Sequence, residues 1–179
     1  MKSVFISRNL TNQSDFKAIL ERKGWEVTGT SLIDFTPADF DFVPKTDWIF
    51  FYSKKGIQFF LKDLTYLTTQ IDLNLVRIGT IGEATANSLR ENGITPHFIG
   101  SGNPDTTASQ FLNLAKGNSV LFPRALNSKQ SIEKKLLHQI KCYTLVVYIN
   151  LPKTDCRMLS QQLLVFTSPL NVEAYFNKY

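Results

Sequence analysis

The stretch Trp48-Ile49-Phe50-Phe51-Tyr52-Ser53 decides the fold of this 179-residue chain. It is a short apolar run that ends in a small polar residue directly before a helical pattern, which is typical of a buried parallel strand followed by its crossover helix. The same phrase returns as Leu163-Leu164-Val165-Phe166-Thr167-Ser168, about 115 positions later. The repeat indicates that one structural unit occurs twice in the chain.

A second phrase repeats at nearly the same offset. Ser3-Val4-Phe5-Ile6-Ser7-Arg8 returns as Ser119-Val120-Leu121-Phe122-Pro123-Arg124. One likeness between two Val- and Phe-rich strands carries little weight, but two likenesses at one offset indicate an internal duplication. The chain is therefore expected to hold two related α/β halves.

Composition favours a folded chain with an anionic partner. Hydrophobic residues make up 43% and aromatic residues 12% of the sequence, which is ample for a core. The net charge is +5, spread along the chain, and it suits a polyanionic small molecule as well as nucleic acid. No run has the roughly 18 uncharged apolar residues of a membrane span, and the N-terminus lacks a secretory pattern, so we expect a cytoplasmic protein without membrane contact.

The cysteines and histidines give no sign of a metal site. Cys142 and Cys156 lack metal-ligand spacing, and reduced, structural thiols are expected. His97 and His138 have no evident carboxylate or nucleophile partner, which favours structural or surface roles. We therefore expect no bound metal.

Strands alternate with helices along most of the chain. Strands are expected near residues 3–7, 25–33, 48–52, 75–79, 96–99, 119–122, 144–150 and 163–167, and helices near 13–23, 54–62, 83–92, 105–115, 128–139 and 169–178. This alternation predicts parallel sheets with right-handed crossovers.

Two segments are predicted to join domains. Residues 34–47 carry two prolines and four aspartates without a period, and a second connector surrounds Asn150-Leu151-Pro152. These segments predict a discontinuous first domain, residues 1–33 plus 151–179, an inserted second domain, residues 36–143, and connectors at 34–35 and 144–150. Hinged α/β pairs of this kind bind ligands in the cleft between domains.

Polar residues gather where the expected strands end, which is where open α/β sheets bind ligands. They are Arg8, Ser53 to Gly56, Gly82 to Thr85, Arg124 and Thr167 to Pro169. Ser53 and Ser168 each place a hydroxyl and free backbone N–H groups at a helix N-terminus. Such a position is an anion site or a simple N-cap, and the two interpretations are compatible. The segment Ile81–Ala86 lacks the spacing of a dinucleotide or Walker loop, so nucleotide binding is not supported.

The order of these motifs resembles that in uroporphyrinogen-III synthases across the whole chain. The resemblance is carried by the strand ending in Arg8, Trp48–Ser53, Ile81–Ala86 before a Leu-Arg-Glu-Asn-Gly helix end, Val120–Arg124, Val146–Tyr148, and Val165–Pro169 followed by Val172. It implies an α/β fold of two flavodoxin-like parallel-sheet domains joined by a two-stranded connector. It also implies a cytoplasmic lyase of heme (porphyrin, tetrapyrrole) biosynthesis that cyclises hydroxymethylbilane with D-ring inversion and loss of water, through a spirocyclic intermediate and without a cofactor or metal.

The resemblance also assigns roles to individual residues. Tyr148 is expected to assist departure of the substrate hydroxyl. Carboxylate groups of the substrate are expected to bind at Ser53, Lys55, Thr85 and Ser168, with Arg8 at the edge of the cleft. A small-molecule polycarboxylate is thus the expected partner, rather than nucleic acid or a membrane.

One departure from the family pattern concerns the first domain. In the family a Gly-Thr-Ala segment, the counterpart of Gly82–Ala86, follows the Thr-Ser-Pro helix, and by the internal repeat it would fall beyond Tyr179. The first domain is therefore expected to be incomplete. A monomer is expected from the family, whereas an incomplete domain would favour an oligomer.

Two other functions fit parts of the sequence. A non-catalytic two-domain ligand binder or an inactive family member would agree with an incomplete first domain, and tetrapyrrole turnover separates it from the enzyme. A nucleic-acid-binding module has less support, because the chain has no helix-turn-helix pattern or basic aromatic sheet motif.

Overall fold

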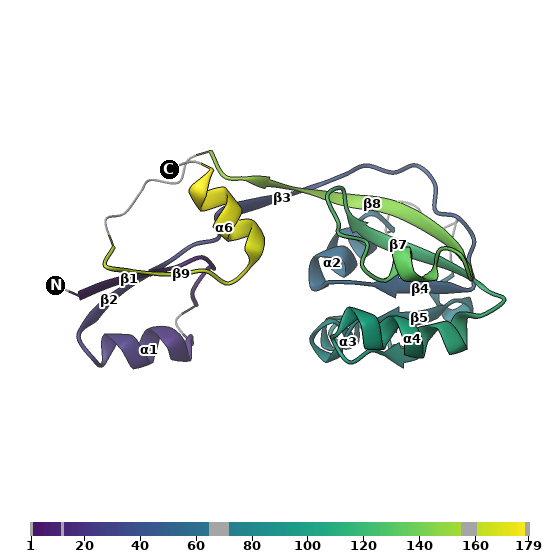
Figure 1. Ribbon diagram of the computed structural model, residues 1–179, viewed down its shortest axis with the longest axis horizontal. Helices are drawn as coiled ribbons and strands as arrows, with labels where there is room; N and C mark the ends of the chain where they lie inside the picture. Colours follow the sequence, from purple (N-terminus) through teal and green to yellow (C-terminus); the bar gives the residue numbers. More distant parts are fainter. Residues whose placement is uncertain (1, 12, 65–71, 155–160, 178–179) are drawn as a thin grey trace. The chain divides into compact units, whose positions relative to one another are not determined.

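The computed structural model describes residues 2–11, 13–64, 72–154 and 161–177 (Figure 1). The chain divides into two compact units. The first unit is Met1–Phe35 with Asn150–Tyr179, and the second unit is Thr36–Ile149. This division follows from contacts within the chain. The expected domains, 1–33 plus 151–179 and 36–143, are segments that would fold independently, and they stay a prediction.

A six-stranded sheet of order β3-β8-β7-β4-β5-β6 contains the strands of the second unit. Neighbouring strands from β8 to β6 pair in parallel, as the intervening helices require. The strands are β3 (Ile33–Pro37), β4 (Trp48–Phe51), β5 (Arg77–Thr80), β6 (Phe98–Ile99), β7 (Ser119–Ala125) and β8 (Lys141–Pro152).

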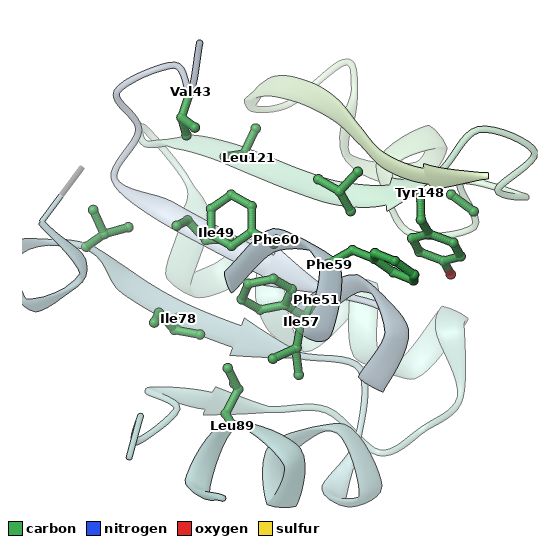
Figure 2. Packing of buried hydrophobic residues seen from close by; sticks show 13 residues of the cluster. Val43, Ile49, Phe51, Ile57, Phe59, Phe60, Ile78, Leu89, Leu121 and Tyr148 are labelled. Atoms are coloured by element: carbon green, nitrogen blue, oxygen red, sulfur yellow. The ribbon is translucent and has the colours of Figure 1, made fainter. Parts of the chain in front are cut away.

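Helices cover both faces of this sheet. On one face lie α2 (Lys54–Leu64) and α3 (Glu83–Arg90), which contribute Ile57, Phe59, Phe60 and Leu89 to a cluster shown in Figure 2. On the other face lie α4 (Pro104–Ala115) and α5 (Glu133–Leu136), and a short 3-10 helix, η1 (Leu73–Leu75), precedes β5. Because both faces are covered, all four residues of β4 are buried, which explains its uninterrupted apolar run.

Local signals set the ends of α4. The Asn103 side chain accepts hydrogen bonds from the backbone N–H groups of Asp105 and Thr106, at 2.9 and 3.1 Å, and Pro104 takes the first helical position. Gly117, just after the helix, has a φ of 78°, a left-handed conformation that glycine adopts at low cost. The helix therefore begins and ends where its sequence directs.

The first unit contains a three-stranded parallel sheet of order β2-β1-β9. Its strands are β1 (Lys2–Ile6), β2 (Trp25–Gly29) and β9 (Leu163–Val165), and its helices are α1 (Asp15–Glu21) and α6 (Pro169–Phe176). Phe5, Leu164 and Ala174 join β1, β9 and α6 in one apolar cluster.

The two repeated phrases occupy equivalent places in the two sheets. β1 and β7 carry one phrase, and β9 and β4 carry the other. In the first unit β1 pairs in parallel with β9, and in the second unit β7 pairs in parallel with β4. The order β2-β1-β9 thus matches β8-β7-β4. Among the described residues of the first unit, nothing corresponds to β5 and β6.

The expected strand at residues 25–33 is two strands. β2 ends at Gly29 and the chain turns at residues 30–32. β3 begins at Ile33 and continues to Pro37, within the stretch 34–47 that showed no period in the sequence. Lys153 N donates to Leu32 O at 2.8 Å and Ala38 N donates to Val147 O at 3.1 Å, so β3 and β8 run antiparallel. The alternation of strands and helices predicted the parallel pairs of the sheets. The antiparallel pair of β3 and β8 lies instead in the segments from which a two-stranded connector was expected, where no crossover helix is needed.

Residues 144–150, expected both as a strand and as a connector, belong to the long strand β8. Thr144, Leu145, Val146 and Tyr148 pair with β7, and the rest of the strand continues beside β3 (Figure 1). The helix expected at 128–139 is confined to α5, because Gln130 has a φ of 54° and interrupts the helical backbone. The other expected elements agree with the observed ones to within three residues at each end, apart from residue 178, which lies outside the described residues.

Candidate functional site

Ser53 lies between the end of β4 and the start of α2. Its Oγ accepts a hydrogen bond from the backbone N–H of Gly56 at 3.1 Å, and its carbonyl accepts one from Ile57 at 3.3 Å. The hydroxyl therefore caps the helix, as one of the two interpretations of the sequence expected. The same position brings a hydroxyl to the positive end of the α2 dipole.

Tyr148 approaches Ser53 from β8. Its hydroxyl oxygen lies 3.4 Å from Ser53 Oγ, and its ring stacks on Phe59 of α2 with centroids 5.3 Å apart and planes inclined by 19°. Only 8% of the residue is exposed. Figure 2 shows the two rings side by side at one end of the cluster, with the phenol oxygen turned away from the aliphatic side chains. The structure thus brings together two residues that are 95 positions apart.

Lys55 lies beside the Phe59 ring that stacks on Tyr148. Its Nζ lies 5.9 Å from the centroid of the Phe59 ring, within the range of a cation–π contact, and donates to Gln58 Oε1 at 2.9 Å. A shallow depression between α2 and α3 includes Lys55, and its lining residues are Lys54, Lys55, Gln58, Leu61, Lys62, Ser88 and Asn92. It excludes Ser53 and Tyr148, so we place the candidate site at their contact rather than in the depression.

Thr85 lies at the same edge of the sheet as Ser53. Ile81 N, at the end of β5, donates to Phe51 O at the end of β4 at 3.1 Å, so the turns that follow the two strands are neighbours. Thr85 is buried in the first turn of α3, which starts after Gly82. A Cβ on Gly82 would lie 3.1 Å from the Gly102 Cα, so the close approach of two loops favours glycine here.

Arg8 and Ser168 belong to the first unit. Ser168 Oγ caps α6, accepting hydrogen bonds from Asn171 N at 3.3 Å and Asn171 Nδ2 at 2.8 Å. Arg8 follows β1 and is exposed. Because β1 and β9 are parallel neighbours, both residues lie beyond the carboxyl ends of adjacent strands. The expected cleft between domains stays a prediction.

Two further residues lie at that edge: Thr167, which was among the polar residues expected where strands end, and Ser7, which was not. Thr167 N donates to Ser7 Oγ at 2.9 Å, and Thr167 Oγ1 donates to Ser7 O at 2.9 Å. Ser7 is 1% exposed, and its hydrogen bonds with Thr167 join the ends of β1 and β9. The small polar residue at the end of each repeated apolar phrase was the signal that pointed to them.

A buried polar network on the opposite face of the second unit's sheet also escaped the sequence analysis. Glu133 is 5% exposed; its Oε1 accepts from Thr144 Oγ1 at 2.7 Å and its Oε2 accepts from Tyr52 Oη at 3.2 Å. Glu133 N donates to Tyr52 Oη at 3.0 Å, and Arg124 Nε lies 3.7 Å from Oε2. The signal was an acidic residue inside the apolar stripe of Ile132 and Leu136.

Neighbouring groups respond to this buried carboxylate. Burial and the charge of Glu133 raise the pKa of Tyr52 far above its ordinary value. The same two causes, burial first, raise the pKa of the Cys142 thiol to about 11. Tyr52 and Cys142 therefore stay neutral at physiological pH.

Three other observations concern His97, metal-ligand groups and membrane-spanning helices. His97 Nδ1 accepts a hydrogen bond from Ile78 N at 3.0 Å, which supports the structural role expected for it. Within residues 2–11, 13–64, 72–154 and 161–177, no three His, Cys, Asp or Glu side chains gather as metal ligands would. In the same part of the chain, no helix has the length and apolar character needed to cross a bilayer.

Comparison with known proteins places the chain among relatives of one kind. The family model for uroporphyrinogen-III synthase HemD matches residues 14–178. A uroporphyrinogen-III synthase of Chlorobaculum parvum (strain DSM 263 / NCIMB 8327) is 28% identical over 200 residues, covering 98% of this chain and 78% of the relative.

Solved structures show the same fold. Uroporphyrinogen-III synthetase from Helicobacter pylori 26695 is similar with a TM-score of 0.69 and 20% identity, covering 100% of this chain and 79% of that one. A mutant uroporphyrinogen III synthase from the extremely thermophilic bacterium Thermus thermophilus gives a TM-score of 0.68 at 18% identity, covering 99% of this chain and 77% of that one. The family and the mixed α/β fold expected from the motifs are confirmed. The chain belongs to the uroporphyrinogen-III synthase family, whose members are lyases that cyclise hydroxymethylbilane.

Proposed function

We propose that this chain converts hydroxymethylbilane to uroporphyrinogen III in the cytoplasm, with inversion of the D ring and loss of one water. The substrate is primed to expel hydroxide and form a stabilised azafulvene cation. The enzyme then needs to hold the folded chain and prevent direct closure of the unrotated D ring, so a strong nucleophile is not required. A small polyanion, rather than nucleic acid or a membrane, suits the spread positive charge of the chain.

The observation that carries this proposal is the contact between Tyr148 and Ser53. It sets a phenol 3.4 Å from a hydroxyl at a helix N-terminus. A carboxylate of the substrate held by the α2 N-terminus and Lys55 would lie beside the phenol. Tyr148 then donates a hydrogen bond or a proton to the departing hydroxyl.

The remaining site residues bind carboxylates in this proposal. Thr85 and Ser53 follow the neighbouring strands β5 and β4 at the carboxyl edge of the second unit's sheet. Ser168 provides an equivalent helix N-terminus in the first unit, and Arg8 supplies a charge near it. We expect the working enzyme to be a monomer, as in the family resemblance.

The test is turnover of freshly prepared hydroxymethylbilane, with the type III and type I isomers separated after oxidation. Wild-type protein should yield type III above the uncatalysed type I background. Tyr148→Phe should keep the fold and slow type III formation by about 100-fold, the usual contribution of a positioned proton donor.

Tyr143→Phe is the matched control, because Tyr143 lies on the same strand and packs against the same cluster. It should retain wild-type turnover. Type I product alone from the wild-type protein would contradict the proposed activity, whereas equal rates for Tyr148→Phe and wild type would leave Tyr148 with a packing role.

A further inference from the structure

Side chains along β8 alternate between the two faces of the sheet. Tyr143 and Leu145 pack against the cluster beneath α2 and α3. Cys142 packs against the opposite cluster, and Thr144 on that side donates to Glu133. Continued alternation would place Tyr148, an even-numbered residue, on the Glu133 face and away from Ser53.

Tyr148 instead lies on the Ser53 face, because β8 contains a bulge. Arg124 of β7 pairs with Val146, but the next residue, Ala125, pairs with Tyr148. Val147 is thus an extra residue, and both Val147 and Tyr148 join the cluster beneath α2 and α3. A bulge of one residue reverses the face of every side chain that follows it.

The Arg124 side chain holds the backbone opposite the bulge. Its Nη1 donates to Ala125 O at 2.9 Å and to Leu126 O at 3.1 Å. Leu126 N in turn donates to Tyr148 O at 3.0 Å. The guanidinium therefore lies two hydrogen bonds from the backbone of Tyr148, on the face of the sheet opposite its phenol.

Glu133 holds Arg124 in this place. The two side chains are 10% and 6% exposed, and the 3.7 Å between Nε and Oε2 is an ion pair rather than a hydrogen bond. Tyr52 and Thr144 satisfy the carboxylate oxygens, so the charge on Glu133 is oriented as well as buried.

We propose that Arg124, held by Glu133, is a positioning residue that maintains the β8 bulge and so directs the Tyr148 phenol toward Ser53. The inference rests on the proposed function only in that Tyr148 acts on the substrate. The placement of the phenol is a claim about the protein itself and can be tested without turnover.

Arg124→Lys tests the role of the guanidinium. Lysine retains the positive charge beside Glu133, but its single ammonium cannot place one nitrogen at Glu133 and another at the two carbonyl oxygens, as Nε and Nη1 of the guanidinium do. We expect kcat for type III formation to fall by about 10- to 100-fold, the size of effect that a displacement of about 1 Å produces, with KM within about two-fold of wild type. Nuclear magnetic resonance contacts between the labelled Tyr148 and Phe59 rings should weaken.

Arg77→Lys is the matched control. Arg77 lies at the opposite end of the sheet, where it contacts Asn118 and the Trp48 ring, and it touches none of these groups. Its turnover and its Tyr148–Phe59 contacts should equal those of wild type. Retained ring contacts and unchanged kcat in Arg124→Lys would overturn the inference.

A double variant guards against misfolding. Removing one member of a buried ion pair leaves an uncompensated charge, whereas Arg124→Met with Glu133→Gln removes both charges and keeps one acceptor oxygen and the shape of the side chain. This variant should show a cooperative thermal unfolding transition, which indicates a folded protein. It should also lose the Tyr148–Phe59 contacts and show the same fall in kcat as Arg124→Lys. A folded double variant with intact contacts would contradict the proposal.

Combination with Tyr148→Phe separates the two claims. If Arg124 acts through the phenol, Arg124→Lys should have little further effect on turnover in the Tyr148→Phe background. A full additional loss there would overturn the inference and leave the proposed function intact. If Tyr148→Phe alone does not slow turnover, the assigned role of Tyr148 fails, and the ring contacts still decide whether Arg124 positions it.

Discussion

Glu133 shows how one buried residue sets the chemistry of its neighbours. Its charge and the surrounding apolar residues raise the pKa values of Tyr52 and Cys142. Both groups are acids that are neutral when protonated, so in the folded state they ionise at a higher pH than in the unfolded chain. Their ionisation therefore couples stability to alkaline pH.

The Cys142 thiol gives a measurable form of this coupling. Its pKa rises from 9.0 to about 11 on folding, so its contribution to stability is fully present below pH 9 and is lost as the pH rises toward 11. We expect the free energy of unfolding to fall over that range by about 1 kcal/mol more in wild type than in Cys142→Ala, allowing for solvent access to a half-buried group. Urea unfolding at pH 8, 9, 10 and 11 measures it. Parallel pH profiles for the two proteins would contradict the expectation.

At the scale of single elements, the α2 helix depends on its first residues. Ser53 Oγ accepts from Gly56 N, and Lys54–Leu64 then runs for 11 residues. Ser53→Ala should lower the free energy of unfolding by about 1 kcal/mol, because the cap is lost, while Ser53→Gly should cost only a few tenths. Ser109→Ala, at an exposed position within α4, should be close to neutral. Denaturant unfolding compares them, and an equal loss for Ser53→Ala and Ser109→Ala would show that the cap is unimportant.

Elements with strong local signals could be predicted from the sequence. The apolar run of β4 and the Asn103-Pro104 start of α4 indicated their structure and its position directly. β3 could not be predicted, because most of its residues are exposed and the strand exists through its pairing with β8. The length of α5 was overestimated, because hydrophobic periodicity does not reveal that Gln130 has a left-handed backbone conformation.

The candidate site was predictable in part for the same reason. Ser53 and Ser168 follow apolar runs, and the structure shows that each caps a helix. The contact of Ser53 with Tyr148 depends on a bulge, and a one-residue change of register leaves no mark in the pattern of β8. The Glu133 network joins residues from β7, β8, the turn after β4 and α5, so only the tertiary structure reveals it.

At the scale of the whole molecule, the second unit is one uninterrupted segment. Thr36–Ile149 contains two apolar clusters, one on each side of its sheet. We expect a chain of residues 36–149 to fold alone and to unfold cooperatively, because few of its apolar contacts require the rest of the protein. Calorimetry and the dispersion of its amide resonances measure this. The Arg124→Met and Glu133→Gln exchanges, made in the same segment, should leave its folding intact. An unfolded 36–149 segment would contradict the expectation that this unit folds independently.

The antiparallel bonds between β3 and β8 have a consequence for the order in which the protein folds. Ala38 and Val147 are joined at 3.1 Å, so once the second unit has formed its two ends meet. Ser7 and Thr167, 160 positions apart, are then separated by a much shorter effective loop. Since the entropy of closing a loop grows with its length, early folding of the central segment lowers the entropic barrier to bringing β1 and β9 together. The terminal segments should therefore assemble last, after the folded second unit has shortened the loop that must close between β1 and β9.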